Sequence, residues 1–413
     1  MTDPTREIVV TGYGVCCNLG DDANDVEAAL RAGRHPPFQR WETAVEYNCR
    51  CQLVGLYPGD LSDGALGLDK AEGRFMGRSS RLALRAARQA VARAGLNGPE
   101  ARDLAVVVGS GTGDVDAIIE VRRKLDETKN ARKVLPTMVP RLMASTVSAN
   151  LVNVLRTTGP SFCATAACAG GAYNLLLAAE LLRSGHCTRA LAGGAEVIDI
   201  HFHAGFDSMR AYNGGDNDHP ERASRPYAAD RAGFIFAEGA GLLVLETRAG
   251  AAARGAEVLG VLRGWGMSSD GEGQMVAPSS DGAYRAMVAA LRHASVAPGD
   301  VDYVNTHGTS TPLGDVGEVK AIRRAFDGRP VAYSSTKGST GHTVSAAGAL
   351  EAAFTLAMLR GGWVAPSVNA RPLDPALADY APVMDPLDRP LRLALSNSFG
   401  FGGTNVTLVL GPP

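Results

Sequence analysis

The sequence predicts an α/β fold made of two similar halves, and three observations lead to this prediction. Short apolar runs alternate along the chain with segments whose apolar residues recur at helical spacing, as in strands and helices packed in layers. From about Glu257 the alternation begins again, so residues 257–413 repeat the order of elements of residues 1–256. No low-complexity stretch separates these halves, and we expect them to pack together rather than move independently.

Each half alternates strands with helices. Ile8-Val9-Val10 is the first apolar run, and Gly12 and Gly14 are expected to end its strand. In the rest of the first half we predict helices at residues 78–94 and 175–183 and strands at residues 104–108, 190–193 and 241–246. In the second half we predict helices at residues 282–293, 315–325 and 346–360 and strands at residues 258–262, 301–305, 393–396 and 405–410.

Composition and charge exclude several classes of protein. With 45% hydrophobic and 20% charged residues, the chain has the balance of a globular protein. A net charge of -2 gives no general attraction to nucleic acid or to an anionic membrane. No apolar run is long enough to cross a bilayer, and the N-terminus lacks the layout of a signal peptide. We therefore expect a cytoplasmic enzyme that binds neither nucleic acid nor membrane.

The seven cysteines form neither a disulfide framework nor a complete metal site. Their odd number and wide spread argue against paired disulfides. Cys49 and Cys51 have the spacing of half a metal site, but no second Cys or His pair follows nearby, and Leu53-Val54 indicates a strand. We therefore predict buried thiols there and no bound metal.

A glycine-rich segment at residues 108–113, VGSGTG, follows a predicted strand as a phosphate-binding loop would. Its glycine spacing does not match the dinucleotide fingerprint, and no Lys-Ser/Thr pair ends it. We predict a tight turn from strand to helix at this place.

Cys168 is the candidate nucleophile. It lies where a run of small residues passes into a helix rich in Leu and Ala. A thiol at the start of a helix meets the positive end of the helix dipole and free backbone N–H groups, which favour the thiolate. The alternative is a cysteine buried in an alanine-rich core, and this segment alone does not decide between the two.

Two histidines add to this candidate site. His307 follows a predicted strand, and a helix with Asp315 and Glu318 comes after it. His342 ends a polar segment that contains Lys337 and precedes the helix of Glu351, while residues 397–405 are predicted as a glycine-rich loop between strands. A single histidine is more often structural than catalytic. A cysteine at a helix start with two histidines and a lysine, however, is typical of nucleophilic catalysis.

These segments resemble the β-ketoacyl synthase family of the thiolase superfamily. The similarity runs nearly end to end and is carried by three long motifs: HGTSTPLGD at residues 307–315, KGSTGHTVSAAG at 337–348 and NSFGFGGTN at 397–405. Residues 206–209 and 270–279 are most similar to the elongating branch with two histidines, the type I and type II synthases. The resemblance implies a thiolase-like fold, in which two duplicated α/β halves form a five-layer αβαβα sandwich. The first half would carry the nucleophile, and the second both histidines and the glycine-rich gate loop.

The implied reaction is a decarboxylative Claisen condensation. An acyl chain on Cys168 would react with malonyl-acyl carrier protein to give 3-ketoacyl-acyl carrier protein, in fatty-acid or in type II polyketide or polyene biosynthesis. No resident cofactor is implied, because phosphopantetheine arrives on the acyl carrier protein. The family also implies a dimer, either with a second copy or with a ketosynthase-like subunit. The sequence does not decide the pathway or the chain length.

The resemblance also implies a role for each residue of the site. His307 and His342 would promote decarboxylation and stabilise the enolate, and Lys337 would set the electrostatics of the site and contact Glu318. The backbone N–H groups of Cys168 and Phe401 would form the oxyanion hole, with Phe401 also a gate. The remaining implied roles are support of the site for Glu318, Glu351, Asn305 and Asp315, contact with pantetheine or substrate for Thr309, Thr311 and Gly402, and the acyl pocket wall for Phe206.

Two positions depart from the family pattern. Ala166 stands where a hydroxyl residue is common, and Gly170 stands where Ser or Thr is common. We expect both to lie against the acyl pocket and to affect chain preference.

A basic face for the acidic carrier protein is a further candidate feature. Asp126 and Glu127 are interleaved with the basic residues, so a solvated helix face is the favoured interpretation. The basic residues considered are Arg74, Arg78, Arg81, Arg122, Arg123, Lys124, Lys129, Arg132 and Lys133.

Three alternatives remain beside this assignment. A thiolase would need a second cysteine near the C-terminus, yet none follows Cys187. The condensing enzymes with a Cys-His-Asn set carry Asn where this chain has His342. A chain-length-factor-like partner subunit, which does not elongate, would lack the nucleophile, and Cys168 argues against that alternative.

Overall fold

The structure is a computed structural model that describes residues 7–96, 101–271, 275, 276 and 278–413. Ten strands of this part of the chain form one sheet, in the order β10-β9-β13-β14-β8-β1-β7-β6-β4-β5. The strands of the first half are β1 (Ile8–Cys17), β4 (Ala105–Gly109), β5 (Ser161–Phe162), β6 (Arg189–Glu196) and β7 (Gly239–Thr247). Those of the second half are β8 (Gly260–Ser269), β9 (Tyr303–Asn305), β10 (Ala332–Ser334), β13 (Ala394–Gly400) and β14 (Thr404–Gly411).

The two halves have the same topology. In the first half the strand order is β5-β4-β6-β7-β1, and in the second it is β10-β9-β13-β14-β8, which matches it strand for strand. In both, the first three strands are parallel and the last two join antiparallel. The halves meet where Ile8–Val10 of β1 pairs antiparallel with Gly260–Leu262 of β8. The duplication predicted from element order is therefore visible in the strand connections.

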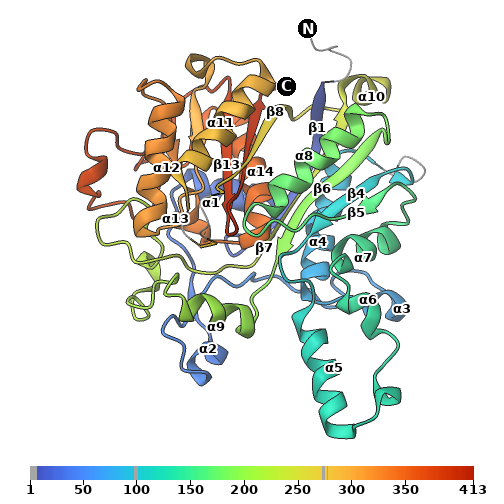
Figure 1. Cartoon of the computed structure of the whole chain (residues 1–413). Coiled ribbons are helices and arrows are strands. Elements are labelled where there is room, and N and C mark those ends of the chain that lie inside the picture. The colour runs from blue at the N-terminus through green and yellow to red at the C-terminus, as the bar shows by residue number, and fades with distance from the viewer. Residues whose placement is uncertain (1–6, 97–100, 272–274, 277) are drawn as a thin grey trace.

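Helices lie between and outside the two halves of the sheet. α8 (Gly170–Arg183) and α14 (Ala347–Gly361) pack against each other in the middle (Figure 1). α4 (Arg78–Arg93) and α7 (Thr146–Leu155) cover the outer face of the first half, and α11 (Ser280–Ala294) and α12 (Pro312–Ala325) cover that of the second. This arrangement confirms the five-layer, thiolase-like α/β fold.

Shorter elements complete the described part of the chain. β2 (Gln39–Arg40) pairs with β3 (Leu53–Val54), and β11 (Trp363–Val364) pairs with β12 (Leu387–Asp388). The other helices are α1 (Ala23–Arg31), α2 (Glu42–Glu46), α3 (Lys70–Gly73), α5 (Val115–Thr128), α6 (Met138–Leu142), α9 (Ile200–Ser208), α10 (Arg248–Ala253) and α13 (Lys337–Thr340). In the described ranges, no helix is both long enough and apolar enough to cross a membrane.

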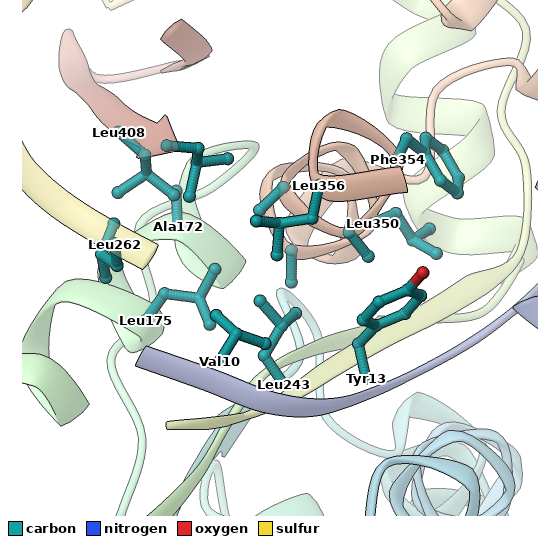
Figure 2. Close-up of a cluster of buried hydrophobic side chains, with 14 of the residues drawn as sticks. Val10, Tyr13, Ala172, Leu175, Leu243, Leu262, Leu350, Phe354, Leu356 and Leu408 are labelled. Carbon is teal, nitrogen blue, oxygen red and sulfur yellow. The ribbon is translucent and has the colours of Figure 1, made fainter. Parts of the chain in front are cut away.

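The central core lies between α8, α14 and the sheet. Figure 2 shows Ala172 and Leu175 of α8 and Leu350 of α14 above Val10 of β1 and Leu243 of β7. All of these side chains are at most 1% exposed. Burying an aliphatic side chain of this size contributes roughly 1.5–3 kcal/mol, so this shared core holds both halves together.

The glycines of β1 correct one prediction. Gly12 and Gly14 do not end the strand, which continues to Cys17. A Cβ atom at Gly12 would lie 2.1 Å from the carbonyl oxygen of Ala90 in α4, and one at Gly14 would lie 2.0 Å from that of Ala86. The glycines therefore let the helix backbone approach the strand. Gly266 of β8 stands in the same relation to α11, because its Cβ would lie 2.1 Å from the carbonyl oxygen of Ala286.

The other predicted elements are all present, with some differences at their ends. β8 continues to Ser269, well beyond the predicted end at residue 262. Residues 397–405 are not one loop: β13 extends to Gly400 and β14 starts at Thr404, so the two strands form a hairpin with a tight turn. The glycine-rich residues 110–113 form the predicted turn between β4 and α5, and both Cys49 and Cys51 are buried.

Candidate active site

One cavity of about 510 Å³ brings together the main residues predicted from the sequence. Cys168 and Phe206 line it from the first half, and His307, His342 and Phe401 line it from the second. Each of these residues lies at or next to the end of a helix or strand. In the first half, Cys168 is two residues before α8 and Phe206 is in the last turn of α9. In the second half, His307 is two residues after β9, His342 is two residues after α13, and Phe401 directly follows β13. The duplicated fold thus brings chain segments from both halves to one point.

Cys168 lines this cavity and is buried, with 6% of the residue exposed. Burial raises the pKa of the thiol to about 12, although the charge of Lys337 and the backbone N–H groups of Phe401 and Cys168 lower it. Burial has the largest of these effects on the pKa of the thiol. The backbone N–H groups of Phe401 and Cys168 lie near enough to the sulfur to act on this pKa.

His307 and His342 meet at the cavity with their ring centroids 5.3 Å apart and an interplanar angle of 84°. Burial and the charge of Lys337 hold the pKa of each imidazole well below its ordinary value. Nδ1 of His307 and both ring nitrogens of His342 have no hydrogen-bonding partner among the described residues. Both rings are therefore neutral at physiological pH, and each keeps a nitrogen that can bond a ligand.

Lys337 forms a buried ion pair with Glu351, and both residues are at most 2% exposed. Burial raises the pKa of Glu351 to about 7, and the ammonium group opposes this rise. The prediction that Lys337 contacts Glu318 is wrong, because the ammonium group of Lys337 in α13 donates a hydrogen bond to Glu351 in α14. The ion pair fixes a positive charge close to both histidines and to Cys168.

Glu318 holds the backbone of the first histidine instead. Its carboxylate accepts hydrogen bonds from the N–H groups of His307 at 2.9 Å and Gly308 at 2.8 Å. The amide of Asn397 donates to the same carboxylate at 3.0 Å. Glu318 thus fixes where the His307 ring lies, as its predicted supporting role requires.

Asp315 supports the next part of the same loop. It accepts hydrogen bonds from the N–H groups of Ser310 at 3.1 Å, Thr311 at 3.3 Å and Tyr227 at 2.9 Å. The guanidinium of Arg231 lies 3.4 Å from the Asp315 carboxylate. Tyr227 and Arg231 were not predicted from the sequence, because their region carries no motif that marks them.

The comparisons with known proteins fit this geometry. A model of the β-ketoacyl synthase N-terminal domain matches residues 5–251, and a model of the C-terminal domain matches residues 259–371. This chain belongs to the β-ketoacyl synthase family. Over 412 residues it is 37% identical to 3-oxoacyl-[acyl-carrier-protein] synthase 1 of Haemophilus influenzae, and the match covers 98% of both chains.

Solved structures of ketosynthases have the same fold. A β-ketoacyl synthase from Burkholderia phymatum STM815 aligns with a TM-score of 0.92 and 33% identity, over 98% of this chain and 99% of that one. The ishigamide ketosynthase/chain length factor aligns with a TM-score of 0.88 and 29% identity, over 99% of each chain.

In this member of the β-ketoacyl synthase family, two of the three residues predicted to contact pantetheine or substrate in this region line the cavity. Thr309 and Thr311 line the cavity, with their hydroxyl oxygens 3.2 Å apart. Gly402 is not among the residues that line it: this residue has a φ of 83° in the β13–β14 turn and donates its N–H to the carbonyl of Met275 at 2.8 Å. Its neighbours Phe401 and Gly403 face the cavity instead.

Aromatic rings surround the reacting groups. The Phe206 and Phe401 rings are 5.7 Å apart, which places the predicted pocket residue beside the predicted gate. Phe234 packs edge-on against His342 at 5.1 Å, and Phe399 lies 5.8 Å from His307. Phe234 was not predicted, although its apolar segment gives a signal for burial.

Three other predicted positions lie away from the cavity surface. The Ala166 carbonyl accepts a hydrogen bond from Thr404 Oγ1 at 3.3 Å, and a Cβ at Gly170 would contact Ser345. Neither residue is among the described residues that line this cavity, so their place against the acyl pocket stays a prediction. Asn305 is buried, and within the described ranges its side-chain amide has no hydrogen-bonding partner. Its predicted support of a loop is therefore not made through a direct hydrogen bond.

Proposed function

We propose that this protein is a 3-oxoacyl-acyl carrier protein synthase that condenses an acyl group on Cys168 with a malonyl unit. The observation that carries this proposal is the meeting of Cys168 with two neutral imidazoles in one cavity. A nucleophile and two hydrogen-bonding rings are the groups that thioester exchange and decarboxylation need. The reaction needs no resident cofactor, because the thioester and its phosphopantetheine arrive on an acyl carrier protein.

In the first step the Cys168 sulfur attacks the carbonyl carbon of an acyl thioester. The new bond joins the Cys168 sulfur to carbon, the bond from carbon to the pantetheine sulfur breaks, and the thiol proton ends on the pantetheine sulfur. The N–H groups of Cys168 and Phe401 stabilise the negative oxygen of the tetrahedral intermediate. Burial raises the pKa of this thiol, so we propose that it loses its proton as it attacks the thioester.

In the second step a malonyl thioester loses carbon dioxide. The electrons of the broken carbon–carbon bond form an enolate, and N–H groups of His307 and His342 stabilise its oxygen. The enolate carbon then attacks the acyl carbonyl, and the bond to the Cys168 sulfur breaks. The sulfur leaves as a thiolate and takes up one proton from solvent, which balances the loss of carbon dioxide from a carboxylate. Neutral imidazoles suit this step, because it needs hydrogen-bond donors rather than a strong base.

The test is intact-protein mass spectrometry with a panel of acyl-carrier proteins, comparing wild type with Cys168→Ala. We expect a mass gain of one acyl group in the wild type alone. Malonyl-carrier protein should still be decarboxylated by the variant, because both histidines remain. If Cys168→Ala forms 3-ketoacyl product at the wild-type rate, the proposal is wrong. The absence of acylation in wild type with any donor would favour a partner subunit that does not elongate.

The carrier protein is proposed to dock at the cavity mouth, because its pantetheine arm must pass Thr309 and Thr311 to reach Cys168. Met209, Met275 and Leu313 line this cavity and are at least 45% exposed, so they offer an apolar rim. The basic residues of α5 support docking less well. Arg122 pairs with Asp126 and Arg123 with Glu127 along the same helix, as on a solvated helix face.

We also propose that the chain works as a dimer, with a second copy or with a ketosynthase-like subunit. β5 is the edge strand of the sheet and both of its residues are exposed, which leaves a backbone edge that another strand can pair with. Exposed apolar side chains are also present in α5, in α6 and beside α6, namely Ile118, Leu135, Val139, Leu142 and Met143. Light scattering of Phe162→Lys against wild type tests this interface, and an unchanged mass would exclude it.

A further inference from the structure

Glu196 is a buried carboxylate that the proposed reaction does not use. It is the last residue of β6 and has no exposed surface. Its shortest contact is with Ser345 Oγ, which donates at 2.7 Å. Ser110 Oγ and the N–H of Gly111 both donate at 3.0 Å, and Thr112 Oγ1 donates at 3.3 Å. A buried carboxylate is stable only when several donors surround it in this way.

The donors to Glu196 come from both halves of the fold. Residues 110–112 belong to the turn after β4 in the first half. Ser345 belongs to the second half and lies three residues after His342 in the chain. Its N–H also points to the Glu196 carboxylate, at 3.4 Å. One carboxylate therefore connects the strand layer of the first half with the segment that carries His342.

Ser345 also packs against the start of the helix that follows the nucleophile. Added Cβ atoms at Gly170 and Gly171, in the first turn of α8, would meet Ser345 at 3.3 Å and 2.8 Å. Cys168 lies two residues before this turn, so Ser345 packs next to the segment that carries the sulfur. The Glu196 charge also reaches the thiol, since it raises the pKa of Cys168 while Lys337 lowers it.

From these contacts we infer that Glu196 is a positioning residue, which fixes the Cys168 segment relative to His342 across the two halves. This inference rests on the proposed function, because it assumes that both residues act on the same substrate. Glu196 touches none of the residues proposed to react. It acts through Ser345 on one side and through the 110–112 turn on the other.

Removal of the Glu196 charge should raise the rate of Cys168 alkylation and lower the rate of condensation. The positioning role of Glu196 can be measured because these two rates change in opposite directions. Without the carboxylate, the pKa of Cys168 falls, so a larger fraction of the thiol is ionised at a given pH. Alkylation by iodoacetamide then becomes faster, by about tenfold for each unit that the pKa falls, because only the thiolate reacts. Condensation becomes slower, because the Cys168 segment and the His342 segment lose their common anchor.

The test compares Glu196→Gln with wild type at matched protein concentration. Glutamine keeps the size of the side chain but replaces one acceptor oxygen with an NH₂ donor, which faces the donors around it. Alkylation of Cys168 is followed by peptide mass spectrometry between pH 6 and pH 10, and condensation is followed with acyl- and malonyl-carrier protein. Ser345→Ala is the second variant, since it removes the shortest bond and leaves the charge in place.

Glu246→Gln is the matched control. Glu246 is also a fully buried carboxylate, bonded to Thr11 and Arg254. Glu246 lies opposite Arg189, which is at the other end of β6 from Glu196. Arg189 and Glu196 are seven strand residues apart, which corresponds to about 23 Å, so Glu246 is far from Glu196. We expect this control to lower stability without changing the alkylation profile.

We expect Glu196→Gln to stay folded, to alkylate several-fold faster than wild type at pH 8, and to condense at least tenfold more slowly with little change in KM. Ser345→Ala should condense more slowly as well, with an alkylation profile close to that of wild type. A folded Glu196→Gln that condenses within twofold of wild type overturns the inference. So does one whose alkylation profile is unchanged. Alkylation of Cys168 can be measured whether or not the protein catalyses condensation. If the proposed function is wrong, wild type itself forms no 3-ketoacyl product, and this outcome is distinct from failure of the inference about Glu196.

Discussion

The imidazole rings of His307 and His342 meet edge to face, 5.3 Å apart, and the charge of Lys337 acts on both. Burial and this charge lower the pKa of both rings, so the pair is neutral. The N–H group of each neutral ring can donate a hydrogen bond to a developing enolate. The following predictions depend on this relationship.

The first prediction concerns pH. A group with a lowered pKa keeps its neutral form down to that lower value, so both histidines stay neutral as the pH falls through 6.5. Malonyl decarboxylation by Cys168→Ala, which avoids titration of the thiol, should therefore hold its rate to below pH 6 and decline only under more acidic conditions. The measurement is carbon dioxide release across pH 4.5 to 8. A midpoint at pH 6.5 or above would show that the rings titrate normally.

The second prediction concerns the Lys337–Glu351 pair. Lys337→Met removes the cation that lowers both histidine pKa values, so the acid limb of the decarboxylation profile should move to higher pH. It also leaves the Glu351 carboxylate buried without its partner, which costs roughly 3–5 kcal/mol of unfolding free energy. Denaturant unfolding and the pH profile measure the two effects.

The double variant Lys337→Met/Glu351→Gln separates these effects. It removes both buried charges, so it should recover part of the lost stability while its acid limb stays shifted. If the double variant restores the wild-type pH profile, the lysine charge is not what lowers the histidine pKa values.

The third prediction separates the two steps of the reaction. His307→Ala and His342→Ala each remove one donor to the enolate, so decarboxylation should fall on the order of 100- to 1000-fold. Acylation of Cys168 should persist within about tenfold, because the backbone N–H groups of Cys168 and Phe401 remain. Carbon dioxide release and intact mass report the two steps on the same samples.

His342→Gln is the control for this prediction, since its side-chain amide still carries N–H donors. It should recover part of the decarboxylation rate. A histidine variant that loses acylation but keeps decarboxylation would reverse the assigned roles.

Much of the site was predictable because its residues stand in long motifs. The Cys168 segment was ambiguous by itself, and its combination with the motifs that contain His307, Lys337 and His342 made the site predictable. The order of strands and helices was also predictable, since buried runs and helical spacing are local features. Local patterns do not show which side chains meet across the two halves, and the errors arose there.

Two features of the site illustrate this limit. The partner of Lys337 is Glu351 and not Glu318, because the turn of α13 directs the lysine toward α14, which no sequence pattern specifies. The burial that raises the pKa of the Cys168 thiol was not visible in its own segment, because the side chains packed around it come from distant parts of the chain. Glu196 was missed for a related reason: the predicted strand ended at residue 193, three residues before the carboxylate.

The fourth prediction concerns the glycines that let helices approach the sheet. Gly14→Ala places a Cβ atom 2.0 Å from the carbonyl oxygen of Ala86, and Gly266→Ala places one 2.1 Å from that of Ala286. Backbone must move in both variants, so each should lose at least about 3 kcal/mol of unfolding free energy, at the upper end of the cost of overpacking. Because the two halves share a topology, we expect losses of similar size in both.

Gly317→Ala is the matched control, because an added Cβ in α12 meets no atom within 4 Å. Alanine restricts the unfolded chain and suits a helix, so this variant should gain about 0.5–1 kcal/mol. Denaturant unfolding at one protein concentration compares the three, which keeps any contribution from association constant. If Gly14→Ala is as stable as Gly317→Ala, the close approach of α4 to β1 does not need glycine. The strand would then tolerate a side chain, and the role assigned to these glycines would be wrong in both halves.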